Sequence, residues 1–331
     1  MSKLAYTTLI LAVILLNACS GTKKIEETNP KPGWVLNRPI TQAYYTGIGI
    51  AQKWGTPDNY KSDARQKALA DMAGQVNAKI SSTSVLHKVE DKSGINEIYS
   101  SSIKSSSLEY LEGYQEVDSY EDENYYYVYY QLSKLHFAEL KVKRKEEAFN
   151  NSFSKYDQAV IEKENGNDYS ALQLFINSLE TMADYLGEDN TRLHNNKSFD
   201  VCIESTNQIQ SIINNLKITP RQSTISAIKG NMVESDLLNF TVINNNNKPQ
   251  SNIPVKFIYS SGYLRKDKDS SDQNGKINTT IHHINDKDLT QTLCAEIDVL
   301  NLIRNLTSDL LIRKLIDQTS GASSCISIRV Q

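Results

Sequence analysis

Hydrophobic positions in the first part of the folded chain change from the spacing of a strand to that of a helix. Residues 44–51 are rich in β-forming side chains, which predicts a strand that carries Gly47 and Gly49 on one face. After Asp58 and Asn59, which can cap a helix, apolar residues recur at helical intervals. This stripe consists of Ala64, Ala68, Leu69, Met72, Ala73, Val76 and Ile80. Its small side chains favour a helix packed closely on the strand.

Alternating apolar and polar residues predict an antiparallel meander after this helix. Strand-like alternation begins at residue 77 and ends before a turn at residues 91–94. Further strands are predicted at residues 95–109, 110–117 and 125–132, and a charged hairpin loop precedes the last of them. One helix on an antiparallel sheet is an α+β arrangement, which we expect for this part of the chain.

The middle of the chain has the spacing of helices. Residues 145–164 contain no Gly or Pro, residues 169–180 carry apolar side chains at helical intervals, and a turn at residues 165–168 separates them. A turn this short predicts an antiparallel helical hairpin. A third amphipathic helix is predicted near residues 199–216, and Pro220 ends it. We expect these helices to link an N-terminal domain to a C-terminal one.

The last third of the chain returns to short strands separated by turns. Apolar and polar residues alternate in residues 237–243, 253–259 and 276–281, and turn-forming segments separate these stretches. This pattern predicts a β-sandwich. Apolar residues at helical intervals in residues 297–316 predict one or two helices inserted before a last strand at residues 325–330. The predicted fold class is therefore α+β, with an N-terminal helix on an antiparallel sheet, a middle helical hairpin, and a C-terminal β-sandwich with a helical insertion.

Composition and charge argue against some classes of function but do not indicate a particular one. The chain has 331 residues, of which 39% are hydrophobic and 23% charged, so each predicted domain has enough apolar material for a core. The net charge of −3 and the pI of about 6.0 give no reason to expect a nucleic-acid partner. The five histidines occur at no spacing typical of a metal site or a catalytic triad. We expect no metal, no cofactor and no enzymatic activity; a hydrolase that uses Glu109 and Glu112 as paired carboxylates is the remaining enzymatic alternative.

A short apolar run at the N-terminus ends at a cysteine. Residues 9–16 are all aliphatic and follow Lys3, but a helix needs about 20 apolar residues to cross a bilayer, so the run is typical of a signal peptide. Residues 16–19 read Leu-Asn-Ala-Cys, which resembles the bacterial lipoprotein signal. This resemblance implies that Cys19 becomes the mature N-terminus and carries acyl chains such as palmitate, and Ser20 favours the outer membrane. The alternative is an ordinary secretory signal with an unmodified cysteine.

Three cysteines remain if Cys19 is lipidated. None of the cysteine spacings is Cys-x-x-Cys, so redox and metal motifs find no support. Cys294 and Cys325 lie in apolar, strand-like contexts, and an oxidising envelope would allow them to form a disulfide. Because buried free cysteines are common, the alternative is that both stay reduced.

The first predicted domain contains a further pattern of aromatic, proline and small residues. It reads Pro-x-Trp, then Pro, then Tyr-x-Gly-x-Gly-x-Ala, followed by an alanine-rich helix. The matching residues are Pro32, Trp34, Pro39, Tyr45, Gly47, Gly49, Ala51, Ala64, Ala68 and Leu69. This pattern resembles the LPP20 lipoprotein family, and the match covers about a third of the chain. The resemblance implies a non-catalytic role in an envelope or flagellar-associated assembly.

Two other patterns bear on binding. The order Pro-Val-Lys-Phe, Gly and Ser-Asp-Gln-Asn-Gly-Lys-Ile-Asn-Thr-Thr-Ile within residues 254–281 resembles bacterial Ig-like repeats. Residues 125–130 are tyrosines except for Val128. Because successive side chains of a strand point to opposite faces, we expect half of these tyrosines in the core. The outward half is a candidate contact surface for a partner or a sugar.

These patterns predict a lipid-anchored cell-envelope protein with a non-catalytic binding or scaffolding role at the outer membrane. Its lipid binds the membrane, and the further partner is expected to be an envelope protein or a glycan. A surface-exposed adhesin or glycan-binding lipoprotein is the alternative. The predicted organisation is a signal peptide at residues 1–18, a flexible tether at 19–32, an LPP20-like α+β domain at 33–141, a helical linker domain at 142–218, and an Ig-like β-sandwich domain at 219–331.

Overall fold

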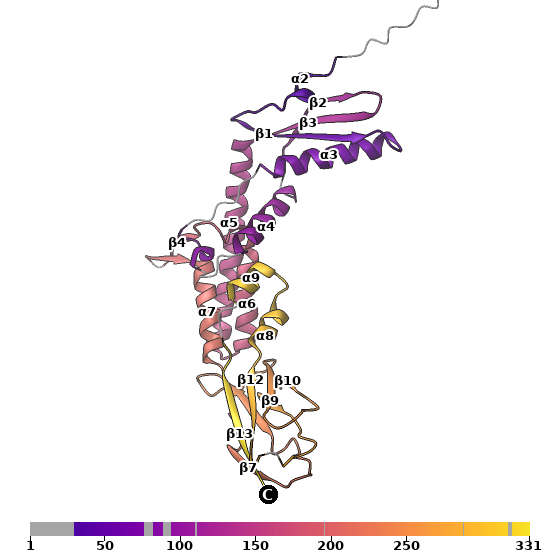
Figure 1. Ribbon diagram of the computed structural model, residues 1–331. Coiled ribbons are helices and arrows are strands. Elements are labelled where there is room, and N and C mark those ends of the chain that lie inside the picture. Colours follow the sequence, from indigo (N-terminus) through magenta and orange to yellow (C-terminus); the bar gives the residue numbers. More distant parts are fainter. Residues whose placement is uncertain are drawn as a thin grey trace, which may run out of the picture.

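The arrangement of the chain is known from a computed structural model that describes residues 30–75, 82–88, 94–109, 111–194, 196–286, 288–316 and 320–331. The predicted signal peptide, Cys19 and most of the predicted tether lie outside these residues. Figure 1 shows an elongated molecule, with a small sheet at one end, helices in the middle, and further strands at the other end, where the C-terminus lies. This mixture of helices and mostly antiparallel sheets confirms the predicted α+β class.

The N-terminal sheet is antiparallel and has the strand order β1-β3-β2. Its elements are β1 (Tyr44–Gln52), β2 (Gln115–Glu121), β3 (Tyr125–Ser133) and helix α3 (Pro57–Ala73), which covers one face. A Cβ atom on Gly49 would overlap the carbonyl oxygen of Ala64, and one on Gly47 would overlap that of Ala68. The close packing predicted for this strand and helix is therefore confirmed.

Residues 95–109 form a helix, so the strand predicted there is wrong. In α4 (Ile95–Glu109) the buried residues Ile95 and Tyr99 lie one helical turn apart. The Tyr99 hydroxyl donates a hydrogen bond to the carbonyl oxygen of Asp184 at 3.0 Å, and the ring packs against Gly187. Tertiary contacts with the middle part of the chain thus override the strand-like local pattern.

Two neighbouring predictions are also wrong in part. Residues 85–88 form a short 3₁₀ helix, η2 (Val85–Lys88), within the segment predicted as a strand from residue 77 onward. Strand β2 runs through most of the predicted hairpin loop, which shortens to residues 122–124. The loop is held by Asp122, whose Oδ1 accepts hydrogen bonds from the backbone N–H groups of Asn124 and Tyr125.

Three long helices form the middle part. They are α5 (Lys134–Glu164), α6 (Asp168–Thr181) and α7 (Val201–Asn215), and α5 and α6 form the predicted hairpin. The short elements η3 (Ala183–Tyr185), β4 (Thr191–His194) and β5 (Lys197–Asp200) connect α6 to α7. Helix α5 begins directly after β3, so it crosses the predicted domain boundary at residue 141. Its 31 residues span roughly 46 Å and join the N-terminal sheet to the rest of the molecule (Figure 1).

Two sheets form the C-terminal β-sandwich, with strand orders β10-β9-β12-β13-β7 and β11-β8-β6. The strands are β6 (Lys217–Pro220), β7 (Thr224–Ala227), β8 (Asn239–Ile243), β9 (Pro254–Tyr259), β10 (Lys268–Ser270), β11 (Lys276–Asn278), β12 (Thr290–Ile297) and β13 (Ser323–Val330). Phe240 of β8 and Phe257 of β9 meet between the two sheets, with ring centroids 6.0 Å apart. A disulfide joins Cys294 of β12 to Cys325, which is directly opposite on β13.

The helical insertion lies between β12 and β13, where it was predicted. It consists of α8 (Val299–Leu306) and α9 (Leu310–Ile316), which contact the middle helices. One buried hydrophobic cluster continues from these helices into the sandwich, whereas the N-terminal sheet and α3 have a second cluster of their own. The N-terminal sheet and α3 therefore have a core of their own, and the middle helices and the sandwich share another.

Candidate functional site

The N-terminal strap, residues 30–39, lies across the face of the N-terminal sheet opposite α3 (Figure 1). Its short helix is α2 (Gly33–Leu36). The Trp34 ring stacks on Tyr129 with the ring centroids 5.7 Å apart, and its Nε1 donates a hydrogen bond to Asp118 Oδ2 at 2.7 Å. The indole therefore fixes the strap to both β3 and β2.

Charged side chains fasten the two ends of the strap. Lys31 Nζ lies 3.0 Å from Asp122 Oδ2, and its hydrogen bond lowers the pKa of Asp122 to about 2. Arg38 Nη1 lies 2.9 Å from Asp71 Oδ1 of α3, and its Nη2 donates to the carbonyl oxygen of Thr46 at 2.6 Å. Because solvent-exposed ion pairs contribute little individually, we expect the stacked indole to contribute most to the attachment.

The strap covers part of the predicted tyrosine surface. Tyr126 and Tyr130 belong to the cluster beneath α3, as alternation predicts. On the opposite face, Tyr127 and Tyr129 are only 8% and 5% exposed, because Lys31 and the indole of the strap lie over them. Tyr125 stays 41% exposed. The aromatic surface open to a partner is therefore smaller than predicted.

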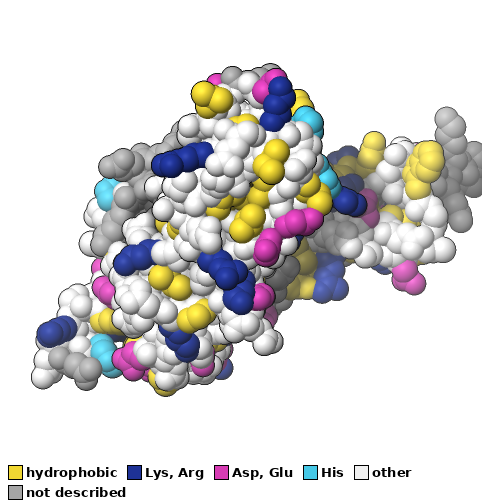
Figure 2. Space-filling model, turned by 90° about the horizontal axis from the view of Figure 1, so that it is seen from below, with side chains coloured by type: hydrophobic (Ala, Val, Ile, Leu, Met, Phe, Trp, Pro, Cys, Tyr) yellow, Lys and Arg dark blue, Asp and Glu magenta, His cyan; other side chains and the backbone are white. Residues whose placement is uncertain are grey.

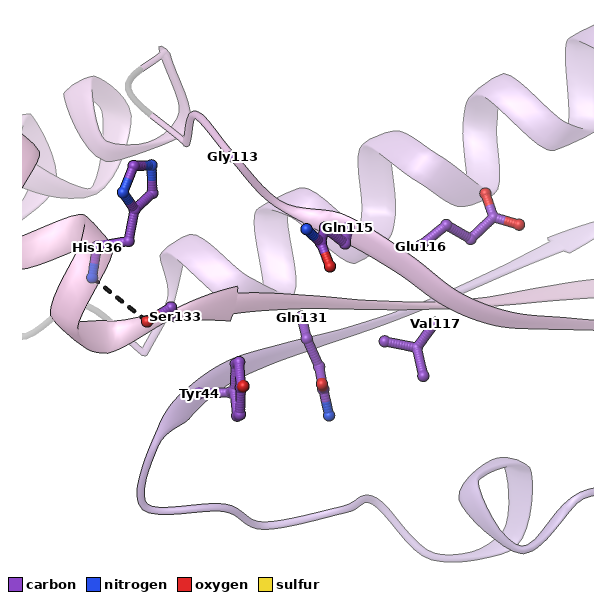
Figure 3. A pocket seen from close by; sticks show the side chains of 8 residues that line it. All are labelled: Tyr44, Gly113, Gln115, Glu116, Val117, Gln131, Ser133 and His136. Carbon is purple, nitrogen blue, oxygen red and sulfur yellow. Dashed lines mark hydrogen bonds between the residues drawn. The ribbon is translucent and has the colours of Figure 1, made fainter.

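An open cavity of about 670 Å³ lies at the end of this sheet where α5 begins. Figure 3 shows Tyr44 and Gln131 projecting to the same side of the sheet, with His136 near the start of the helix. Ser133 caps α5, since its Oγ accepts a hydrogen bond from the backbone N–H of His136 at 3.3 Å. An exposed tyrosine ring beside amide and hydroxyl groups can stack on and hydrogen-bond a neutral polar ligand, such as a sugar.

The single carboxylate of this cavity already has a partner. Glu116 Oε2 accepts a hydrogen bond from the Tyr130 hydroxyl at 2.9 Å. Burial, followed by the hydrogen bond to Glu116, raises the pKa of Tyr130 to about 12. The phenol therefore stays protonated at neutral pH and keeps donating to the carboxylate, which favours a binding site over an acid–base site.

The far end of the β-sandwich presents exposed apolar side chains on its loops. Tyr263 is 99% exposed, and Ile228, Met232 and Leu289 are also exposed on loops next to β7 and β12. A second cavity, of about 570 Å³, lies here and is lined by Met232, Glu234, Arg265, Lys266, Thr280 and His282. Figure 2, which views the molecule from this end, shows hydrophobic side chains in separate groups with Lys and Arg between them. Loops of this kind commonly carry binding residues.

The structure brings together one pair of residues singled out from the sequence. The Cys294–Cys325 pair is bonded, whereas Cys202 is a buried free cysteine, and burial raises the pKa of its thiol. Glu112 lies 2.9 Å from Arg144, and the side chain of Glu109 is outside the part that the structure describes. The acidic pair considered for a hydrolase therefore lies partly outside the described residues.

Among the residues that the structure describes, no group of His, Cys, Asp and Glu side chains is placed to hold a metal ion. No helix in those parts of the chain has the length and apolar character to span a bilayer.

The chain has little similarity to known proteins. No family model matches it, and no curated protein matches it. Among solved structures it is similar to one described as the D00-D0 domain of Intimin, with 16% sequence identity and a TM-score of 0.20. The match covers 35% of this chain and 48% of that chain, so the chain spans about half the length of that structure. Since no family model matches, the LPP20 resemblance stays a prediction from the sequence.

Proposed function

We propose that the protein is a lipid-anchored component of the bacterial outer membrane that binds or scaffolds a partner and catalyses no reaction. Cys19 carries the lipid in this proposal, and the tether leads from it to the strap. The roughly ten residues between Cys19 and the strap reach at most about 35 Å, so the N-terminal sheet stays close to the membrane.

The attachment of the strap is the observation that supports this proposal most. Trp34 and Lys31 fix residues 30–39 to the N-terminal sheet, at the opposite end of an elongated molecule from the sandwich loops (Figure 1). A chain anchored through that segment would hold the sandwich loops away from the membrane. In this arrangement one end of the molecule is anchored and the other end presents exposed apolar loops. Such a separation leaves the loops accessible to a partner, as binding or scaffolding requires.

The residues of the LPP20-like pattern also support a non-catalytic role. Trp34 attaches the strap, and Gly47 and Gly49 allow α3 to approach the sheet. Ala64 and Ala68 are fully buried in that contact. These residues serve packing and not chemistry, which agrees with the non-catalytic role that the LPP20 resemblance implies.

Metabolic labelling tests the anchor. Cells that express the parent chain or the Cys19→Ala variant are fed radiolabelled palmitate, and their membranes are separated by density. We expect label in the parent within the outer-membrane fraction and none in the variant, whereas Cys202→Ala, which removes a buried thiol, keeps the label. Label that persists in Cys19→Ala, or none in the parent, contradicts the proposal.

The second candidate is a surface-exposed adhesin or glycan-binding lipoprotein. The fully exposed Tyr263 and the adjoining 570 Å³ cavity with Arg265 and Lys266 favour it, because an exposed ring and cationic donors suit acidic sugars. Protease treatment of intact cells distinguishes the two. Cleavage in the sandwich loops supports surface exposure, and complete protection supports a periplasmic scaffold.

A further inference from the structure

The helical insertion has an apolar groove on its exposed side. The buried faces of α8 and α9 carry residues such as Leu302, Leu311 and Ile312, which join the shared core. Leu300 and Leu310, however, remain 46% and 55% exposed. Figure 1 places the two helices on the flank of the middle part, away from both ends of the molecule. Two large leucines thus remain exposed although their helices are docked on the core.

The groove between these helices is rimmed by cations. It has a volume of about 190 Å³ and is lined by Leu300, Ile303, Arg304, Leu310, Arg313 and Lys314. No acidic residue lines it, and in the part of the chain that the structure describes none of its three cations is in an ion pair. An apolar floor beneath three positive charges that form no ion pair among the described residues is complementary to an apolar group with negative charges beside it.

Two neighbouring carboxylates cap the helices and do not line the groove. Asp298 accepts a hydrogen bond from the N–H of Asn301, and Asp309 accepts from those of Leu311 and Ile312. The Arg313 Nε donates to the carbonyl oxygen of Thr307 at 2.8 Å, which holds that side chain across the end of α8. The guanidinium is therefore held in place and keeps its charge available.

The size and place of the groove restrict its occupant. Sites for small molecules usually measure about 300–1,000 Å³, so 190 Å³ suits one or two apolar side chains instead. A bilayer presents a broad surface, whereas this groove is a small concave cavity on the flank of the molecule. A short protein segment can enter such a groove and place its flanking charges on the rim.

We infer that the α8–α9 groove binds an acidic segment of a partner protein, which inserts one large apolar side chain between Leu300 and Leu310 and places its carboxylates on Arg304, Arg313 and Lys314. This inference names a further binding surface and does not depend on lipid anchoring. It requires only the folded helical insertion.

Peptide display on the full chain without its signal peptide tests the inference. A random peptide library is selected on the parent protein, and selected peptides are measured by fluorescence polarisation at low and high salt. We expect enrichment of peptides in which Asp or Glu flanks one Leu, Ile, Phe or Met. Binding should weaken at least about tenfold in the double variant Arg304→Glu/Lys314→Glu, and also in Leu310→Ser and at high salt.

Matched controls separate loss of the groove from loss of the fold. Lys143→Glu reverses a charge that is 76% exposed on α5, outside the groove, and should leave binding unchanged. Circular dichroism and thermal unfolding establish that each groove variant is folded, and Leu310→Ser leaves all three cations in place. Selection of peptides without acidic bias, equal binding by the double variant, or no selected peptide at all overturns the inference. Groove-dependent binding to vesicles of anionic phospholipid, without peptide binding, also overturns it.

Discussion

At the scale of single residues, two glycines set the distance between the first strand and the helix that covers it. Gly47 and Gly49 face the α3 backbone at Ala68 and Ala64, so no side chain fits between them. Neither glycine has the positive φ that would require glycine for its backbone conformation. Their role is therefore steric, and it concerns the interior of the N-terminal sheet.

The Gly49→Ala substitution should destabilise this part of the molecule. The added methyl group forces α3 away from β1, which we expect to cost about 1–3 kcal/mol in free energy of unfolding. Gly33→Ala is the matched control, since nothing lies within 4 Å of its added Cβ. Calorimetry should show a lower transition temperature for Gly49→Ala and an almost unchanged one for Gly33→Ala.

The strap should loosen in acid. The pKa of Asp122 is about 2 when paired with Lys31, below the ordinary value of 3.8. Because the folded value is the lower one, the pair stabilises the attached strap above pH 3.8, and that contribution is lost as the pH falls toward 2. The effect is small, since both side chains are partly exposed.

Fluorescence can follow this loosening. Of the two tryptophans, Trp54 is replaced by Phe so that only Trp34 reports. We expect its emission to shift to the red between about pH 4 and pH 2, and this shift to be smaller in the Asp122→Asn variant. The same pH dependence in both proteins contradicts the assignment to Asp122.

At the scale of elements, the disulfide closes the part of the sandwich that contains the helical insertion. Cys294 and Cys325 lie opposite each other on β12 and β13, and α8 and α9 lie between them in sequence. The bond therefore fastens the two strands from which the insertion leaves and to which it returns.

Reduction should destabilise the sandwich. The cysteines are 31 residues apart, and a loop of this length corresponds to about 3–4 kcal/mol in the chain-entropy estimate. We expect urea unfolding of the parent to move to lower urea when a reductant is added. The Cys294→Ser/Cys325→Ser variant should unfold at the lower concentration with or without reductant, and a parent that does not respond to reductant contradicts this expectation.

At the scale of the whole molecule, the two buried clusters predict two unfolding units. One cluster belongs to the N-terminal sheet and α3, and the other extends from the middle helices into the sandwich. The side chain of Gln250 ties the latter two together, since its Nε2 donates to the carbonyl oxygen of Gly166 and its Oε1 accepts from the N–H of Asp168. A sandwich joined in this way should not unfold independently of the helices.

Calorimetry of the full chain should therefore resolve two transitions. Gly49→Ala should lower the temperature of one, and reduction of the disulfide should lower that of the other. A third transition for the sandwich alone, or a single transition that both changes shift, would contradict the division into two cores.

The elements predicted correctly from the sequence are those whose hydrophobic pattern lies within one helix, one strand or one hairpin. The stripe of α3, the α5–α6 hairpin, and the apolar periodicity of α8 and α9 each show a buried face locally. The lipoprotein signal and Cys19 are likewise local, but they lie outside the described residues. Lipidation therefore stays a prediction from the sequence.

Only the tertiary structure decided the features that depend on distant partners. Ile95 and Tyr99 are compatible with a strand or a helix until Asp184 and Gly187 are placed against them. The outward tyrosines of β3 appear open in sequence, but the strap that covers two of them comes from the start of the folded chain. The register of β12 with β13 brings Cys294 opposite Cys325. Local periodicity shows which apolar side chains are expected to be buried. The packing of remote segments decides which residues cover them and which side chains remain exposed to a partner.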